Sequence, residues 1–126
     1  MPLVRIDLPE GNPAEYRAAA AEVIYRALVD VAGAPAGDRF IVITEHERDH
    51  LLMDPHYIVE RTGSALIIQI VFNQGRSISI KKALYRAIAD GLHEQLGLRT
   101  EDVMITLIEV PKENWSFGQG EMQYAD

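Results

Sequence analysis

The sequence repeats itself after 64 residues, and this repeat constrains the fold more than any other feature. The shift places the strand-like run 3–8 on 67–72 and the run 40–43 on 104–107. It also superimposes residues of matching type: Gly11 on Gly75, Leu28 on Leu92, Gly33 on Gly97, Asp38 on Asp102 and Glu45 on Glu109. We therefore predict one domain over 1–126, built from two units at 2–45 and 66–109, with a linker at 46–63 and a tail at 111–126.

A long amphipathic helix is predicted in each unit, over residues 13–32 and 77–96. Apolar residues recur at helical spacing in both segments. Asn12 is a favourable N-cap for the first helix, and Ser77 is the better cap for the second. A glycine follows each segment at the place where a helix commonly stops.

Each unit thus reads as strand, helix and strand. Two such units with right-handed crossovers form an α+β fold, a four-stranded mixed sheet with two helices on one face. Residues 66–72 are nearly all apolar, which predicts that both faces of the sheet are covered. Only the linker and the tail remain to cover the second face, so we expect other subunits to do so and the protein to be an oligomer.

The composition restricts the partners of this chain. Its 126 residues carry a formal net charge of −7, which disfavours nucleic acid, and include no cysteine for a disulfide or thiolate metal site. No apolar run approaches the roughly 18 residues of a membrane span, and the start lacks a signal-peptide pattern. We expect a cytoplasmic protein that binds neither nucleic acid nor membrane. An anionic substrate would need a local cation.

A proline follows the initiator methionine and opens the first predicted strand. If Met1 is removed, Pro2 carries a secondary amine with an unperturbed pKa of roughly 7.7–8.0, suited to acid, base or nucleophilic chemistry. The alternative is that Pro2 merely starts a strand, a position where proline is tolerated. If Met1 is retained, the nitrogen is an amide and this chemistry is blocked.

The repeat exposes a candidate anion site. The second unit has Arg76 where the first has Asn12, and arginine is a poor cap. With Ser77 as the cap, we expect Arg76 to point outward beside the exposed N–H groups of the helix start, where an anion is favoured. The alternative is a solvated arginine.

A carboxylate precedes the second strand of each unit. Asp38 and its counterpart Asp102 occupy the same place in the repeat, which favours a shared structural role such as accepting hydrogen bonds from backbone donors. This equivalence leaves a second role for Asp38 open.

The linker and the tail each allow two interpretations. His46 and His50 lie four residues apart among carboxylates, a pattern compatible with a metal site but also with a solvated loop. The tail contains Trp115, Phe117 and Tyr124, which either pack over an open sheet edge or form the walls of a pocket.

These features together resemble the tautomerase superfamily, and within it the malonate semialdehyde decarboxylase group. The resemblance spans the whole chain and is carried by Met1-Pro2, Gly37-Asp38-Arg39-Phe40, Gly75-Arg76-Ser77 and the segment 114–120, Asn-Trp-Ser-Phe-Gly-Gln-Gly. It implies a homotrimer of chains with two fused units and an active site around an amino-terminal proline, with no cofactor and no metal.

The resemblance also implies roles for particular residues. Pro2 would be the catalytic amine and Asp38 its carboxylate partner, while Arg76 would bind a substrate carboxylate. The substrate-binding walls would be Trp115 and Phe117, with Tyr124 beside them. The decarboxylase pattern has a second arginine where this chain has Gln74, so one of two cationic anchors is missing and Gln74 lines the site in its place.

Three functions follow from this pattern. The first is a cofactor-independent tautomerase that uses Pro2 to transfer a proton on a small 2-keto or 3-oxo carboxylic acid. The second is a decarboxylase or hydratase of the malonate semialdehyde type, in which Pro2 acts as an acid. The third is a non-catalytic interaction protein that keeps the trimeric scaffold, since a fold alone does not fix a function.

Overall fold

A computed structural model describes residues 2–124, so Met1 and residues 125–126 lie outside the described chain. The regular elements are β1 (Leu3–Pro9), α1 (Ala14–Asp30), β2 (Ile41–His46), β3 (Leu66–Asn73), α2 (Ile78–Leu96) and β4 (Val103–Val110). Three short 3-10 turns accompany them: η1 (Arg48–His50), η2 (Thr100–Asp102) and η3 (Lys112–Asn114). The predicted order of strands and helices is confirmed.

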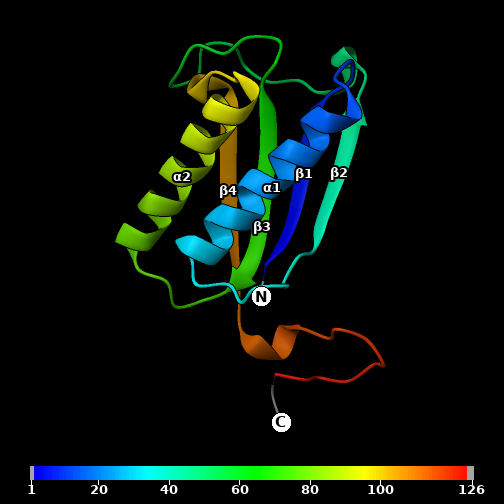
Figure 1. Ribbon diagram of the computed structural model, residues 1–126, viewed down its shortest axis with the longest axis vertical. Helices are drawn as coiled ribbons and strands as arrows, with labels where there is room; N and C mark the ends of the chain where they lie inside the picture. Colours follow the sequence, from blue (N-terminus) through cyan, green and yellow to red (C-terminus); the bar gives the residue numbers. More distant parts are fainter. Residues whose placement is uncertain (1, 125–126) are drawn as a thin grey trace.

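The four strands form one mixed sheet in the order β2-β1-β3-β4. Each outer strand runs parallel to the inner strand of its own unit, and the two inner strands are antiparallel. Both helices lie on the same face of this sheet (Figure 1). The predicted α+β fold is therefore confirmed.

The repeat extends further along the chain than the predicted units. The helices begin at Ala14 and Ile78, and the turns η1 and η3 begin at Arg48 and Lys112, so both pairs keep the spacing of 64 residues. An ion pair is repeated as well. Arg17 Nη1 lies 3.1 Å from Glu45 Oε1, and Lys81 Nζ lies 2.6 Å from Glu109 Oε1.

The core lies between the sheet and the helices. Alternate residues of the inner strands are buried there, as the 2-residue period of a strand requires. The largest fully buried apolar side chains are Val4, Ile6, Leu8, Ile24, Leu66, Ile68, Ile70, Phe72, Leu84, Ile88 and Leu92. The helices pack closely where Gly91 faces Val23, because a Cβ at Gly91 would lie only 2.7 Å from Val23 Cγ1. Burying each large aliphatic chain stabilises the fold by about 1.5–3 kcal/mol.

The face of the sheet away from the helices is partly apolar and exposed in the single chain. Val42, Met104 and Ile108 lie on it and are 39%, 45% and 43% exposed. This is the second face for which the sequence predicted a cover. In the described part of the chain, neither helix is long and apolar enough to cross a membrane.

One predicted helix start is wrong. Pro13, rather than Asn12, occupies the N-cap position of α1, and no side chain of the described residues caps it. The amide of Asn12 points back and donates to Pro9 O at 3.5 Å. The prediction for α2 is confirmed, since Ser77 Oγ accepts from Ile80 N at 3.2 Å and Gly97 ends the helix with a left-handed φ of 69°.

Candidate active site

The predicted site residues gather at one end of the sheet. In Figure 1 this end holds the start of β1, the entry to β2, the end of β3, the start of α2 and the tail after β4. Pro2, Asp38, Arg76 and the tail aromatics therefore come from four segments that are far apart in the sequence. The sheet topology brings these segments together because β1 and β3 are antiparallel neighbours.

Pro2 is buried directly before β1. Leu3 pairs with Val71 in the antiparallel register, so one step further places Pro2 beside Phe72. The Phe72 ring is fully buried and carries the Arg76 guanidinium on its face. Pro2 thus lies at an apolar wall close to a cation. Met1, on whose removal the amine depends, lies outside the described residues.

Asp38 is half-buried in the loop that enters β2. Val4 N donates to Phe40 O at 2.9 Å, which holds the loop of Asp38 beside the start of β1. Burial raises the pKa of the Asp38 carboxyl above its ordinary value of 3.8, and the positive charge of the amino terminus opposes part of that rise.

The loop before β2 is clamped to α1 by a tyrosine and an arginine. Tyr25 Oη accepts from Gly37 N at 2.8 Å, and the Arg39 guanidinium lies 3.9 Å from the centre of the Tyr25 ring. Arg39 Nη2 also donates to Glu22 Oε2 at 2.7 Å. These contacts fix both neighbours of Asp38. Nothing in the spacing of these residues along the sequence indicates this clamp.

Arg76 does not point outward as predicted. Its Nε donates to Ala32 O and its Nη1 to Asn73 O, both at 2.9 Å, and its Cζ lies 4.4 Å from the centre of the Phe72 ring. Burial lowers the pKa of Arg76 from its usual value. The carbonyls of Ala32, in the loop after α1, and of Asn73, at the end of β3, therefore orient the guanidinium, whose remaining N–H groups suit a carboxylate.

The tail aromatics form a cluster next to the end of β3. The rings of Trp115 and Phe117 are stacked, with their centroids 5.7 Å apart. The ring of Tyr124 packs edge-on against that of Phe117, with a centroid distance of 4.9 Å. Trp115 Nε1 donates to Asn73 Oδ1 at 2.8 Å. The tail thus packs on itself and on the strand that leads to Arg76.

Gln74 lies in the turn between β3 and α2, two residues before Arg76. Its backbone N donates to Val110 O at 3.0 Å, and its side chain is exposed. An amide at this position supplies a hydrogen bond but no charge, so Arg76 is the cation that this turn contributes.

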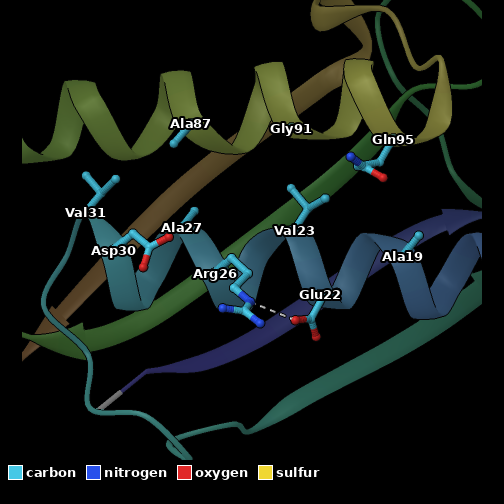
Figure 2. A pocket seen from close by; sticks show the side chains of 10 residues that line it. All are labelled: Ala19, Glu22, Val23, Arg26, Ala27, Asp30, Val31, Ala87, Gly91 and Gln95. Carbon is cyan, nitrogen blue, oxygen red and sulfur yellow. Dashed lines mark hydrogen bonds and ion pairs between the residues drawn. The ribbon is translucent and has the colours of Figure 1, made fainter.

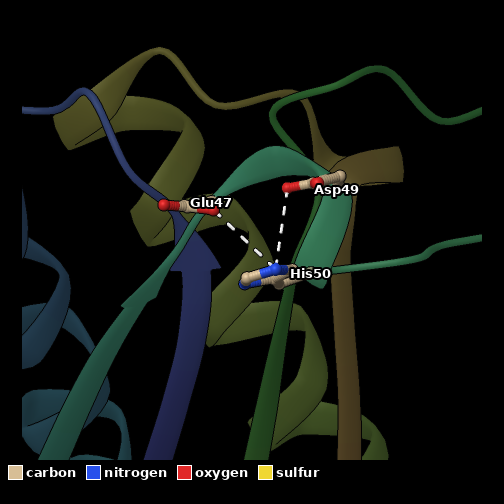
Figure 3. A group of neighbouring side chains, drawn as sticks. All are labelled: Glu47, Asp49 and His50. Atoms are coloured by element: carbon tan, nitrogen blue, oxygen red, sulfur yellow. Dashed lines mark ion pairs between the residues drawn. The ribbon is translucent and has the colours of Figure 1, made fainter.

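The linker does not join the two histidines that suggested a metal site. His46 Nε2 lies 2.6 Å from Asp7 Oδ1 on the sheet, while His50 lies near Glu47 and Asp49 on the turn η1 (Figure 3). Glu47, Asp49 and His50 are all exposed. Exposed carboxylates beside a histidine are common without a metal, and nothing else at this turn indicates one.

A groove of about 630 Å³ lies elsewhere, on the outer surface between α1 and α2 (Figure 2). Small and apolar residues line part of this groove, among them Val23, Ala27 and Gly91. On its rim Arg26 Nε donates to Glu22 Oε1 at 3.0 Å, and this bond and the one from Arg39 lower the pKa of Glu22. Such a tightly paired carboxylate is a poor proton acceptor, so we place the candidate site at the end of the sheet.

Comparison with known proteins identifies the family. Two family models, each described as a tautomerase enzyme, match residues 38–118 and 2–61. The probable tautomerase YusQ of Bacillus subtilis (strain 168) is 38% identical over 124 residues, which cover 98% of each chain.

Two solved structures extend the comparison. FG41 malonate semialdehyde decarboxylase, inhibited by 3-bromopropiolate, superimposes with a TM-score of 0.90 and 36% identity, over 97% of this chain and 93% of that one. A fused 4-OT, solved as a symmetric trimer, superimposes with a TM-score of 0.81 over 98% of each chain, at 20% identity. The second likeness shows the fold alone.

Proposed function

The chain belongs to the tautomerase family, and from that premise we propose that it is a cofactor-independent enzyme that uses the nitrogen of Pro2 to transfer a proton on a small 2-keto or 3-oxo carboxylic acid. The observation that carries the proposal is the convergence of Pro2, Asp38 and Arg76 at one end of the sheet. A buried amine, a carboxylate and an oriented guanidinium are the groups that such a reaction needs.

Arg76 binds the substrate carboxylate in the proposed reaction. The carboxylate accepts N–H groups of the guanidinium that the carbonyls of Ala32 and Asn73 leave available, so the ketone is held at a fixed distance from the cation. The acidic chain, with its net charge of −7, thereby presents a local cation to an anionic substrate.

Pro2 moves the proton. Its neutral nitrogen takes a proton from the carbon next to the ketone, the C–H electron pair forms the enol double bond, and the protonated nitrogen then returns that proton to the carbonyl oxygen to give the enol. The reverse sequence returns the ketone. The apolar wall at Phe72 and the charge of Arg76 disfavour a protonated amine and lower its pKa, whereas Asp38 raises it. The balance decides whether Pro2 acts as a base or an acid.

A second candidate reaction has a specific observation in its favour. FG41 malonate semialdehyde decarboxylase is 36% identical to this chain over almost its whole length. In this reaction a protonated Pro2 would polarise the 3-oxo group, and loss of carbon dioxide or addition of water would follow. Gln74 supplies an amide where the family resemblance implies a second arginine, which weakens the grip on a carboxylate and favours proton transfer.

A substrate panel tests the proposal. Intact mass first establishes that the purified chain begins at Pro2, and keto-enol exchange of phenylpyruvate and decarboxylation of malonate semialdehyde are then followed in parallel. We expect exchange to dominate and Pro2→Ala to slow it by about 10²–10⁴-fold. A chain with a free Pro2 nitrogen that catalyses neither reaction would contradict the proposal and favour the non-catalytic interaction protein.

The assembly is part of the proposal. The exposed apolar residues of the far sheet face, Val42, Met104 and Ile108, would be covered by neighbouring subunits, and a fused 4-OT of the same fold is a symmetric trimer. We therefore propose a homotrimer. Sedimentation equilibrium at micromolar concentration measures it, and a stable monomer would refute it.

A further inference from the structure

One asparagine, Asn73, contacts both the guanidinium and the aromatic cluster of the candidate site. Asn73 is the last residue of β3, and its main-chain oxygen accepts from Arg76 Nη1 at 2.9 Å. Its side-chain Oδ1 accepts from Trp115 Nε1 at 2.8 Å. An indole nitrogen can only donate, so the amide must present its oxygen to Trp115. Asn73 thereby holds the aromatic wall at a fixed place relative to the guanidinium.

The other end of the sheet shows that the fold does not require this arrangement. The repeat places Pro9 at the position of Asn73, Asn12 at that of Arg76 and Leu51 at that of Trp115. Pro9 offers no side-chain acceptor and Leu51 has no donor. By contrast, the ion pair between Lys81 and Glu109 has its counterpart at the first end. Asn73, Arg76 and Trp115 thus all differ from their counterparts, whereas the ion pair is retained.

We propose that Asn73 is a positioning residue that sets substrate selectivity. It fixes the distance between Arg76, which takes the carboxylate, and the stacked rings of Trp115 and Phe117, which take an apolar substituent. The selectivity rests on the proposed function, whereas the hydrogen bond between Trp115 and Asn73 is independent of it. Losing the side-chain contact should weaken binding of an aryl 2-keto acid much more than that of a short one, since the short acid reaches only Arg76.

The chain provides a direct readout of this contact. Trp115 is its only tryptophan, so intrinsic fluorescence reports this site alone. Asn73→Leu removes the acceptor at nearly constant size and leaves the main-chain bond to Arg76 intact. Asn73→Asp keeps an acceptor oxygen. The matched control is Asn114→Leu, an exposed asparagine one residue before Trp115.

We expect Asn73→Leu to shift the tryptophan emission to longer wavelength and to increase its quenching by acrylamide, because the indole turns toward water. Asn73→Asp and Asn114→Leu should keep the emission of the natural chain. In kinetics, Asn73→Leu should raise KM for phenylpyruvate about tenfold, as expected for a lost oriented contact, and change KM for 2-oxobutanoate by less than about twofold. Trp115→Phe keeps a ring but loses the donor, and it should reproduce this KM pattern.

Several outcomes would overturn the inference. Unchanged emission in Asn73→Leu would show that Asn73 does not hold Trp115, and equal KM changes for both acids would show a general loss of structure. If Asn73→Leu does not fold, Trp115→Phe decides the selectivity. If the natural chain turns over no 2-keto acid, the proposed function fails separately, and calorimetric Kd values for 3-phenylpropionate decide the inference instead: a Kd that Asn73→Leu leaves unchanged refutes it, and a weakened one supports it.

Discussion

The two ends of the sheet have the same architecture but different contents. At one end Asp102 is 1% exposed and accepts from Thr62 N at 2.7 Å and Thr62 Oγ1 at 2.5 Å. At the other end its counterpart Asp38 is half-buried, and burial raises the pKa of its carboxyl. Thr62 belongs to the linker that leads into β3. The Asp102 carboxylate therefore serves as a structural acceptor for this linker. Equivalent positions in the repeat therefore have different roles, and the role depends on which segment of the chain lies beside each position.

The helix starts differ in the same way. Both units have a cation in the first turns of the helix that pairs with a glutamate at the end of a strand. Only the second unit has a guanidinium that is oriented by the carbonyls of Ala32 and Asn73. What the units share stabilises the fold, and what one unit has alone marks the candidate site.

The largest effect is expected when the end of the sheet that holds Pro2 is made chemically like the opposite end. In a chain that retains Met1, the Pro2 nitrogen is part of a peptide bond. It is then an amide nitrogen and has no basicity. Turnover should fall by at least about 10²–10⁴-fold, the usual contribution of a general acid or base. Intact mass and kcat, measured on the same sample, check this. Full activity with Met1 attached would remove the functional distinction between the ends.

The next effect concerns the cation. Arg76→Asn installs the residue that the first unit has at this place, Asn12. We expect the transition-state stabilisation calculated from kcat/KM for a carboxylate substrate to fall by about 2–4 kcal/mol, because a buried charge-assisted contact is lost. Most of this loss should come from a higher KM. Arg76→Lys keeps the charge without the planar fork and should recover part of the loss. An unchanged KM would place the anion site elsewhere.

The two aspartates should separate stability from activity. Asp102→Ala removes a buried carboxylate and leaves the Thr62 donors unpaired, so the free energy of unfolding should fall by about 3 kcal/mol. Asp38→Ala should cost less stability and more activity. Urea unfolding with a constant m-value measures the first effect, and kcat/KM measures the second. Equal losses of stability would show that both carboxylates are structural.

The smallest effect is a pH dependence that belongs to Asp38. Its pKa is raised by burial, so the folded state binds this proton more tightly than the unfolded state. Its contribution to stability therefore decreases as pH rises from 3.8 through the raised value, and is constant above it. The difference in unfolding free energy between the natural chain and Asp38→Asn, measured by urea from about pH 3 to pH 7, should follow this course. A difference that grows with pH would show that burial does not dominate the pKa of Asp38.

The sequence by itself determined the topology. A repeat of strand, helix and strand leaves few ways to form one sheet, and the apolar period of each segment decides which side of it meets the core. Local rules also placed the Ser77 cap and the Gly97 stop, since both depend on neighbouring backbone. The same rules failed at Asn12, where Pro13 takes the cap position and the amide turns back to Pro9.

Only the tertiary structure decided how the site is built. Arg76 was expected to point outward, yet it reaches back to Ala32, 44 residues away in the sequence. The Asn73 contact to Trp115 spans 42 residues, and the loop of Asp38 is clamped by Tyr25 on a helix. Such contacts depend on where the sheet order and helix packing place distant segments. A repeat shows which positions are equivalent, but hydrogen bonds form between whatever side chains the fold brings within reach, and these differ at the two ends.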